Sequence, residues 1–298
     1  MKIRHIVLWI AAFVFTLSVA RHQRATGPTY PISGKSSVGG TEFKYVIERT
    51  HGGAGDHPVV LNIDDDLVGG TVHWRRYQFD EPFHTIPMAR EAGILIAYLP
   101  HQPPAGKLEY KIFVEKGNDR VVLPMDKTAV IRYKGDVPLA VLIPHVLMMF
   151  FGLFFSVRVF LGALFGDNIR RLAWITLGCI VVGGFILGPF VQKYAFDAYW
   201  TGWPFGEDLT DNKTAAMFLA WVVAVWRIHR PDPYKRTRWW ILASMIVVFT
   251  VYLIPHSMRG SQINYNTLSA DSLKATIRHY TPDTTQPAQD TTLTRTGQ

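Results

Sequence analysis

The second half of the chain alternates long apolar stretches with short polar links. The apolar stretches cover residues 137–164, 172–190, 215–226 and 239–254. A helix of about 20 mainly apolar residues spans the hydrocarbon core of a bilayer. The third stretch is too short by itself, and it reaches that length only if its helix extends into the polar residues on both sides. The pattern predicts a four-helix transmembrane bundle within residues 137–257, with helices at about 137–164, 172–192, 210–230 and 239–257.

Residues 1–24 have the pattern of a signal peptide or a signal-anchor helix. Lys2 and Arg4 precede an apolar run over residues 6–20. A basic start followed by a short apolar core directs the export of the chain that follows it. The tripeptide Ser18-Val19-Ala20 resembles a cleavage site. The segment is therefore either removed or retained as an anchor, and the sequence leaves both outcomes open.

Residues 25–136 show a different pattern, in which apolar and polar side chains alternate. Such alternation is typical of strands that have one face on a core and the other in water. Together with the α-helical bundle, these strands make the chain an α+β membrane protein. The spacing predicts an exported immunoglobulin-like or fibronectin-III-like β-sandwich, with Trp74 as its largest core side chain. The predicted strands lie at about 43–47, 59–63, 71–77, 94–99, 108–114, 120–123 and 129–133.

Charge differs between the links on the two sides of the predicted bundle. The link 227–238 contains five Lys or Arg residues and one Asp, whereas residues 191–214 contain two Lys and four acidic residues. Basic links stay on the cytoplasmic side of a membrane. We therefore expect a multi-pass protein of the bacterial inner membrane. Its β-sandwich, its loop 191–213 and its polar tail 258–298 lie on the periplasmic side, and the end of that tail is predicted to be disordered.

Composition excludes several classes of protein. The formal net charge of +8 comes largely from basic residues beside the apolar segments, so we assign it to topology and expect no nucleic-acid partner. Cys179 is the only cysteine. A single cysteine excludes an internal disulfide framework, a Cys-rich zinc site and c-type haem attachment.

The loop 191–213 is rich in aromatic residues, glycine and carboxylates. Trp and Tyr prefer the membrane interface, so an aromatic belt with an ordered structural loop is one interpretation. The other is a binding site for a ligand or partner. Its candidate residues are Trp200, Trp203, Asp208, Asp211, Asn212 and Lys213.

Two histidines follow an Ile-Pro pair near the exported ends of the first and last predicted bundle helices. They are His145 and His256. Ionisable residues in transmembrane segments are candidates for function. Two facing imidazoles could bind a b-type haem or, with a nearby Asp, a divalent metal, although a structural role at the interface is the favoured interpretation. We interpret His73, His84 and His101 as surface histidines, because no Asp or Glu accompanies them at ligand spacing.

Two stretches of the chain resemble a group of uncharacterised bacterial inner-membrane proteins. They are Leu99-Pro100-His101-Gln102-Pro103-Pro104-Ala105-Gly106-Lys107-Leu108-Glu109-Tyr110 and residues 194–214, followed by Ile254-Pro255-His256-Ser257. The resemblance implies the architecture described above, an exported sandwich joined to a four-helix bundle. It implies no activity, cofactor or catalytic residue.

The sequence favours a non-enzymatic scaffold or subunit. No Ser-His-Asp grouping, His-Glu-x-x-His motif or phosphate loop is present, and such a protein would bind a membrane or periplasmic partner through its sandwich and loop 191–213. One alternative is an electron-transfer protein that uses haem b or a metal at His145 and His256. A second alternative is a membrane-embedded enzyme that acts at the exported face through Asp208, Asp211 and Lys213.

Overall fold

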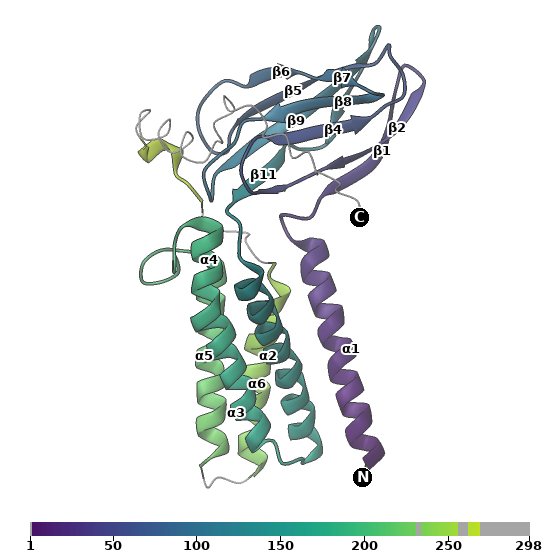
Figure 1. Cartoon of the computed structure of the whole chain (residues 1–298). Helices are drawn as coiled ribbons and strands as arrows, with labels where there is room; N and C mark the ends of the chain where they lie inside the picture. Colours follow the sequence, from purple (N-terminus) through teal and green to yellow (C-terminus); the bar gives the residue numbers. More distant parts are fainter. Residues whose placement is uncertain (1, 231–233, 256–261, 269–298) are drawn as a thin grey trace, which may run out of the picture.

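The computed structural model describes residues 2–230, 234–255 and 262–268. A domain of β-strands sits at one end of a set of long helices (Figure 1). We call the end of the helices next to this β domain the upper end, and the opposite end, where α1 begins, the lower end. The chain is therefore an α+β protein, as expected.

The β domain contains three sheets, and the chain passes back and forth between the two larger ones. A hairpin, β1 (Ile32–Val38) and β2 (Thr41–Ile47), forms the first sheet. The largest sheet has the order β3-β11-β9-β5-β6, with β10 paired to β9, and the third has the order β4-β8-β7. The remaining strands are β3 (Thr50–Gly52), β4 (His57–Asn62), β5 (Gly69–Arg76), β6 (His84–Pro87), β7 (Ala89–Glu91), β8 (Ile94–Leu99), β9 (Lys107–Lys116), β10 (Asp119–Leu123) and β11 (Ala129–Lys134).

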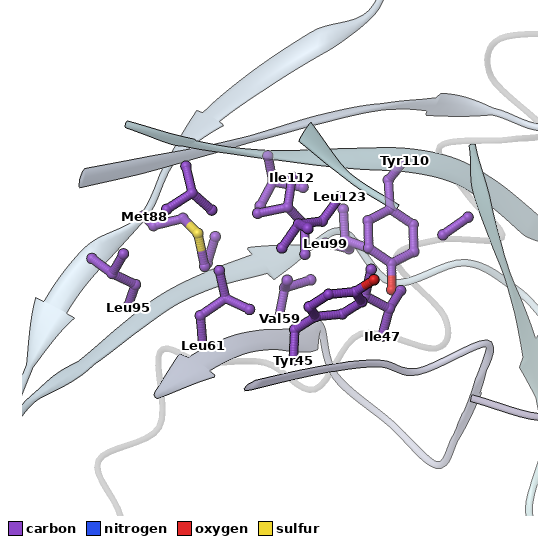
Figure 2. Close-up of a cluster of buried hydrophobic side chains, with 14 of the residues drawn as sticks. Tyr45, Ile47, Val59, Leu61, Met88, Leu95, Leu99, Tyr110, Ile112 and Leu123 are labelled. Carbon is purple, nitrogen blue, oxygen red and sulfur yellow. The ribbon is translucent and has the colours of Figure 1, made fainter. Parts of the chain in front are cut away.

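The sheets enclose one apolar core. Figure 2 shows Tyr110 and Ile112 of β9 facing Tyr45 of β2 and Val59 of β4. The alternation read from the sequence explains this core, because every second residue of β4 is buried. Trp74 lies at the edge of the core rather than at its centre, since its ring stacks on His84 with centroids 4.6 Å apart.

Three helical segments are long and apolar enough to cross a membrane, among the residues that the structure describes. They are Ile3–Thr26, Leu139–Phe165 and Arg170–Phe196, and they identify a membrane protein. The segment Arg238–Leu253 is a shorter apolar helix. In Figure 1 the first two segments are α1 (Lys2–Thr26) and α2 (Leu139–Phe165). The third is a continuous run of α3 (Arg170–Ile180), the π-helix η1 (Val181–Leu187) and α4 (Gly188–Phe196). The shorter apolar helix belongs to α6 (Tyr234–Leu253), which α5 (Leu209–Ile228) precedes.

Helix α1 packs along α2 rather than standing apart from the other helices. Trp9 contacts Phe154 with ring centroids 5.2 Å apart. At the lower end, Asp167 in the link between α2 and α3 accepts from Arg4 at 2.7 Å and from Arg158 at 2.9 Å. The Arg158 side chain is only 6% exposed, so this arginine is buried against a carboxylate and does not extend to the solvent.

Glycines allow close packing around the π-helix η1. A Cβ on Gly183 would lie 2.9 Å from Met148 of α2, and one on Gly184 would lie 2.5 Å from Thr214 of α5. Small residues allow helices to approach closely in lipid. Larger side chains at these two positions would push α2 and α5 away from the π-helix.

Candidate functional site

The β domain meets the helices at the upper ends of α2 and α4. The N–H of Gly135 donates to the carbonyl of Ala195 at 3.0 Å. The guanidinium of Arg132, on β11, lies 5.0 Å from the centre of the Phe196 ring. Residues from both parts of the chain therefore form one junction, and we take this junction as the candidate site.

A loop of residues 197–208, which we call the aromatic loop, joins α4 to α5 beside the junction. The Asp211 carboxylate accepts from the N–H groups of Thr201 at 2.7 Å and Gly202 at 3.0 Å, and from the Gln192 amide at 3.2 Å. The Asn212 side-chain oxygen accepts from the Trp203 N–H at 2.7 Å. Asp211 and Asn212 thus hold the backbone of the loop in place.

Asp208 and Lys213 fix the ends of helices. Asp208 is the N-cap of α5, where its side chain accepts from the Thr210 N–H at 2.7 Å. The Lys213 ammonium donates to the carbonyls of Ile254 at 2.8 Å and Pro255 at 3.3 Å, which end α6. A cation at a helix C-terminus satisfies carbonyls that have no partner within the helix and interacts favourably with the dipole. Four of the predicted binding residues therefore have structural contacts.

Two aromatic side chains of the loop remain exposed. Trp203 is 77% exposed and Phe205 is 82% exposed. Trp200, by contrast, stacks on Phe185 of η1 at 5.7 Å, and its indole N–H donates to the Trp203 carbonyl at 3.2 Å. Figure 1 shows the loop extending sideways from the upper end of α4. The loop therefore presents two apolar rings on a backbone that is held by hydrogen bonds.

A cavity of about 470 Å³ lies inside the junction. It is lined from the loop side by Phe196, Thr201 and Asp208, and from the β domain by Ala105. Gln262 of the C-terminal segment closes another side. The volume falls within the range of small-molecule pockets, about 300–1,000 Å³. The cavity is thus large enough for a small polar ligand or a peptide side chain.

Buried cations of the β domain face this junction. Burial lowers the pKa of Lys107 to about 8, the charge of Arg132 acts in the same direction, and the charge of Asp208 opposes it. Burial also lowers the pKa of Arg132, again against the effect of Asp208. The carboxylate of the loop therefore stabilises two positive charges of the β domain, which couples the two parts electrostatically.

Residues 262–268 return to the β domain. Tyr265 is buried, and its hydroxyl accepts from the Lys107 N–H at 3.0 Å and donates to the Gln102 amide oxygen at 3.2 Å. Burial raises the pKa of Tyr265 to about 12. The sequence predicts only a polar tail here, because one tyrosine among polar residues gives no periodic signal. Residues 269–298 lie outside the described part of the chain.

A second, smaller cavity of about 200 Å³ lies between the helices below the loop. His145, Gln192, Asp208 and Asp211 line it. The Nδ1 of His145 donates to the carbonyl of Gly183 in η1 at 2.9 Å, since a carbonyl can only accept. The volume is below the usual range of ligand pockets and suits water or an ion rather than haem. His256 lies outside the described residues.

A histidine cluster that the sequence does not predict lies on the β domain near the junction. His51 Nδ1 lies 3.3 Å from His57 Nδ1, while His51 Nε2 and His101 Nδ1 both contact the Gly55 carbonyl, at 3.1 and 2.9 Å. Burial lowers the pKa of His57 to about 4, and the neighbouring His51 acts in the same direction. The expectation that His101 is a surface residue is wrong, because it is 4% exposed beneath this cluster.

The cluster does not form a metal site. The two ring nitrogens of His51 face different partners, His57 and the Gly55 carbonyl. In residues 2–230, 234–255 and 262–268, no group of three or more His, Cys, Asp or Glu side chains is arranged to hold a metal ion. The cluster is instead a partly buried set of hydrogen bonds and ring contacts.

Comparison with known proteins gives no family for this chain. No protein-family model matches it, and no curated protein matches it significantly. The function must therefore be argued from the fold and the junction.

Proposed function

We propose that this protein is a multi-pass protein of the bacterial inner membrane that binds a partner protein at its periplasmic face. The β domain, an immunoglobulin-like or fibronectin-III-like sandwich, lies in the periplasm. The aromatic loop and the adjoining β-domain surface form the binding surface. The protein acts as a non-enzymatic scaffold or subunit, and its partner is a membrane or periplasmic protein.

Aromatic side chains at the lower end support this orientation. Trp174, Trp226 and Trp239 are 55%, 52% and 62% exposed there. The guanidinium groups of Arg227 and Arg230 lie 5.5 and 4.7 Å from the Trp226 ring. Exposed tryptophans mark membrane interfaces, and arginines beside transmembrane helices mark the cytoplasmic side.

The length of α5 fits a fourth helix of the predicted bundle. Its 20 residues extend over about 30 Å at 1.5 Å per residue, which is the thickness of the hydrocarbon core. Asp208 and the polar first turn then lie at the upper interface, and Arg227 lies at the lower one. The four helices of the bundle are α2, the run α3–η1–α4, α5 and α6.

Contacts of α1 at both of its ends favour a retained signal anchor. Arg4 pairs with Asp167 at the lower end. At the upper end, the Gln23 amide donates to the Tyr252 carbonyl of α6 at 3.2 Å. A signal peptide that is cleaved off would not keep such contacts with the other helices. We therefore interpret α1 as a permanent fifth helix.

The proposal depends on the two exposed rings of the aromatic loop. Aromatic residues dominate the binding energy of many interfaces, and a surface that is fixed in advance loses little entropy on binding. Asp211 and Asn212 provide that rigidity for Trp203 and Phe205. Lipid headgroups compete as contacts for the same rings, so the test must distinguish a protein from a lipid.

Site-specific photocrosslinking in native membranes makes this distinction. A photoreactive amino acid replaces Trp203 or Phe205, and the matched control replaces Leu219, which is 60% exposed on the middle of α5. We expect a discrete protein adduct from positions 203 and 205 and lipid adducts alone from position 219. Lipid adducts alone from all three positions would reject the proposed function.

A further inference from the structure

An apolar groove runs between α1, α2 and α6. It has a volume of about 440 Å³. Its walls include Ala11 and Phe15 of α1, Leu161 of α2, and Leu242 and Phe249 of α6. The Phe15 and Phe249 rings touch, with centroids 5.3 Å apart, and thereby join the two outer walls.

The size and lining of the groove suit a hydrocarbon chain. An apolar cavity of about 150 Å³ already stays dry and binds benzene. The groove of about 440 Å³ is roughly three times as large, and it lies along helices that are apolar enough for a bilayer. Because its lining is almost entirely apolar, a lipid acyl chain fits the groove better than a polar ligand does.

Cationic side chains stand at the lower end of both outer walls. On α1, Arg4 precedes Ala11 by seven residues, and on α6, Arg238 precedes Leu242 by four. These spacings place each arginine on the groove face of its helix. Arg4 lies about 10 Å below Ala11, and Arg238 lies about 6 Å below Leu242. Side chains of a helix lean toward its N-terminus, so both arginines lean toward the lower end.

Positive charge exceeds negative charge at this end of the groove. Arg4 and Arg158 both pair with Asp167, so two cations share one carboxylate. Arg238 lies over the exposed Trp239 ring, with its guanidinium carbon 5.5 Å from the ring centre. The N-termini of α1 and α6 add the positive ends of two helix dipoles.

We propose that the groove binds an anionic phospholipid of the leaflet at the lower end. One acyl chain occupies the groove, and the phosphate group lies near Arg4 and Arg238. The proposal rests on the proposed retention of α1, which supplies one wall. It concerns a different surface from the aromatic loop, so either proposal can fail without the other.

Native mass spectrometry of the full chain in detergent tests the proposal. The protein is loaded with phosphatidylglycerol or with phosphatidylcholine of the same acyl chains, and the intact mass first establishes that α1 is present. We expect retention of phosphatidylglycerol in preference to phosphatidylcholine. Arg238→Gln should lower that preference about fivefold, the effect typical of one basic residue at an anionic surface.

Matched variants distinguish lipid binding in the groove from non-specific lipid binding elsewhere on the protein. Ala11→Phe fills the groove and should lower the retention of phosphatidylglycerol at least about tenfold. The control Ala20→Phe makes the same change on an exposed position of α1, on the opposite face of the helix, and should leave retention unchanged. Arg120→Gln removes a half-exposed arginine of the β domain and should also have no effect.

Three outcomes would overturn the proposal. They are equal retention of the two lipids by the wild type, undiminished retention by Ala11→Phe, and an unchanged lipid preference in Arg238→Gln. The first would indicate general bilayer lipid, the second a site outside the groove, and the third a headgroup site elsewhere. Photocrosslinks from Trp203 and Phe205 are independent of all three.

Discussion

The backbone N–H of Gly135 donates to the carbonyl oxygen of Ala195 at 3.0 Å. This bond joins the last residues of the β domain to the last turn of α4, although 60 positions separate them in the sequence. The contact is possible because Gly135 has no side chain: a Cβ there would lie 2.3 Å from the Tyr194 carbonyl oxygen.

Gly135→Ala should weaken the junction. Neither the backbone at residue 135 nor that at Tyr194 can move easily. We therefore expect the free energy of unfolding to fall by about 1–3 kcal/mol, the usual cost of overpacking. Thermal unfolding in detergent, followed with limited proteolysis of the junction, measures it. Gly69→Ala is the matched control, because a Cβ at Gly69 meets nothing within 4 Å. Equal stability of the two variants would contradict the tight contact.

Asp211→Ala should release the aromatic loop. The substitution leaves the N–H groups of Thr201 and Gly202 without their acceptor, at a cost of about 1–3 kcal/mol. Protease cleavage within residues 197–208 should become faster, and photocrosslinking from Phe205 should weaken. Glu207→Ala, which removes an exposed carboxylate of the same loop, should cleave at the wild-type rate. Similar cleavage of both variants would show that Asp211 does not hold the loop.

Asp167→Ala should destabilise the helices more than the double substitution Arg158→Met with Asp167→Ala. The single change leaves the buried Arg158 guanidinium without its carboxylate, and loss of one partner of a buried ion pair costs about 3–5 kcal/mol. The double change removes the buried charge as well. Thermal unfolding of the two variants in the same detergent gives the comparison, and a less stable double variant would contradict it.

Acid should destabilise the β domain through His57. Burial lowers the pKa of His57 to about 4, whereas the pKa of an exposed histidine is 6.5. Between these values the unfolded state binds more protons, so the free energy of unfolding falls as the pH falls from about 6.5 to 4. The loss is at most about 3 kcal/mol, given 1.36 kcal/mol per pKa unit.

His57→Asn should flatten this pH dependence. The thermal midpoint of the full chain, measured between pH 7.5 and 4.5, provides the comparison. His84→Asn is the control, because it changes a half-exposed histidine outside the cluster. A wild-type midpoint that does not change over this range would contradict the role assigned to His57.

The sequence predicts most of the β domain because its longer strands have a clear period of two. Each of the seven predicted runs lies within or across an observed strand. The missed strand β1 has the sequence Ile-Ser-Gly-Lys-Ser-Ser-Val, in which only Val38 is fully buried, so it lacks an apolar face. The other missed strands, β3, β6 and β7, are three or four residues long and are too short to show a period.

The sequence singles out the aromatic loop as a candidate site, but it does not predict the contacts that the loop makes. Composition identifies the aromatic loop, because Trp, Gly and Asp cluster in sequence. The acceptor role of Asp211 depends on the path of the loop backbone, which no local pattern encodes. His51 and His101 lie 50 positions apart and meet because β4, which follows His51, pairs with β8, which precedes His101, so their cluster has no signal in the sequence.

The two links between the β domain and the helices are short. Residues 27–31 join α1 to β1, and residues 135–138 join β11 to α2. A fully extended link of five residues reaches at most about 18 Å. The domain is therefore tethered at both of its ends and stays close to the upper ends of α1 and α2. Any molecule that binds the β domain together with the aromatic loop must therefore come close to these helix ends.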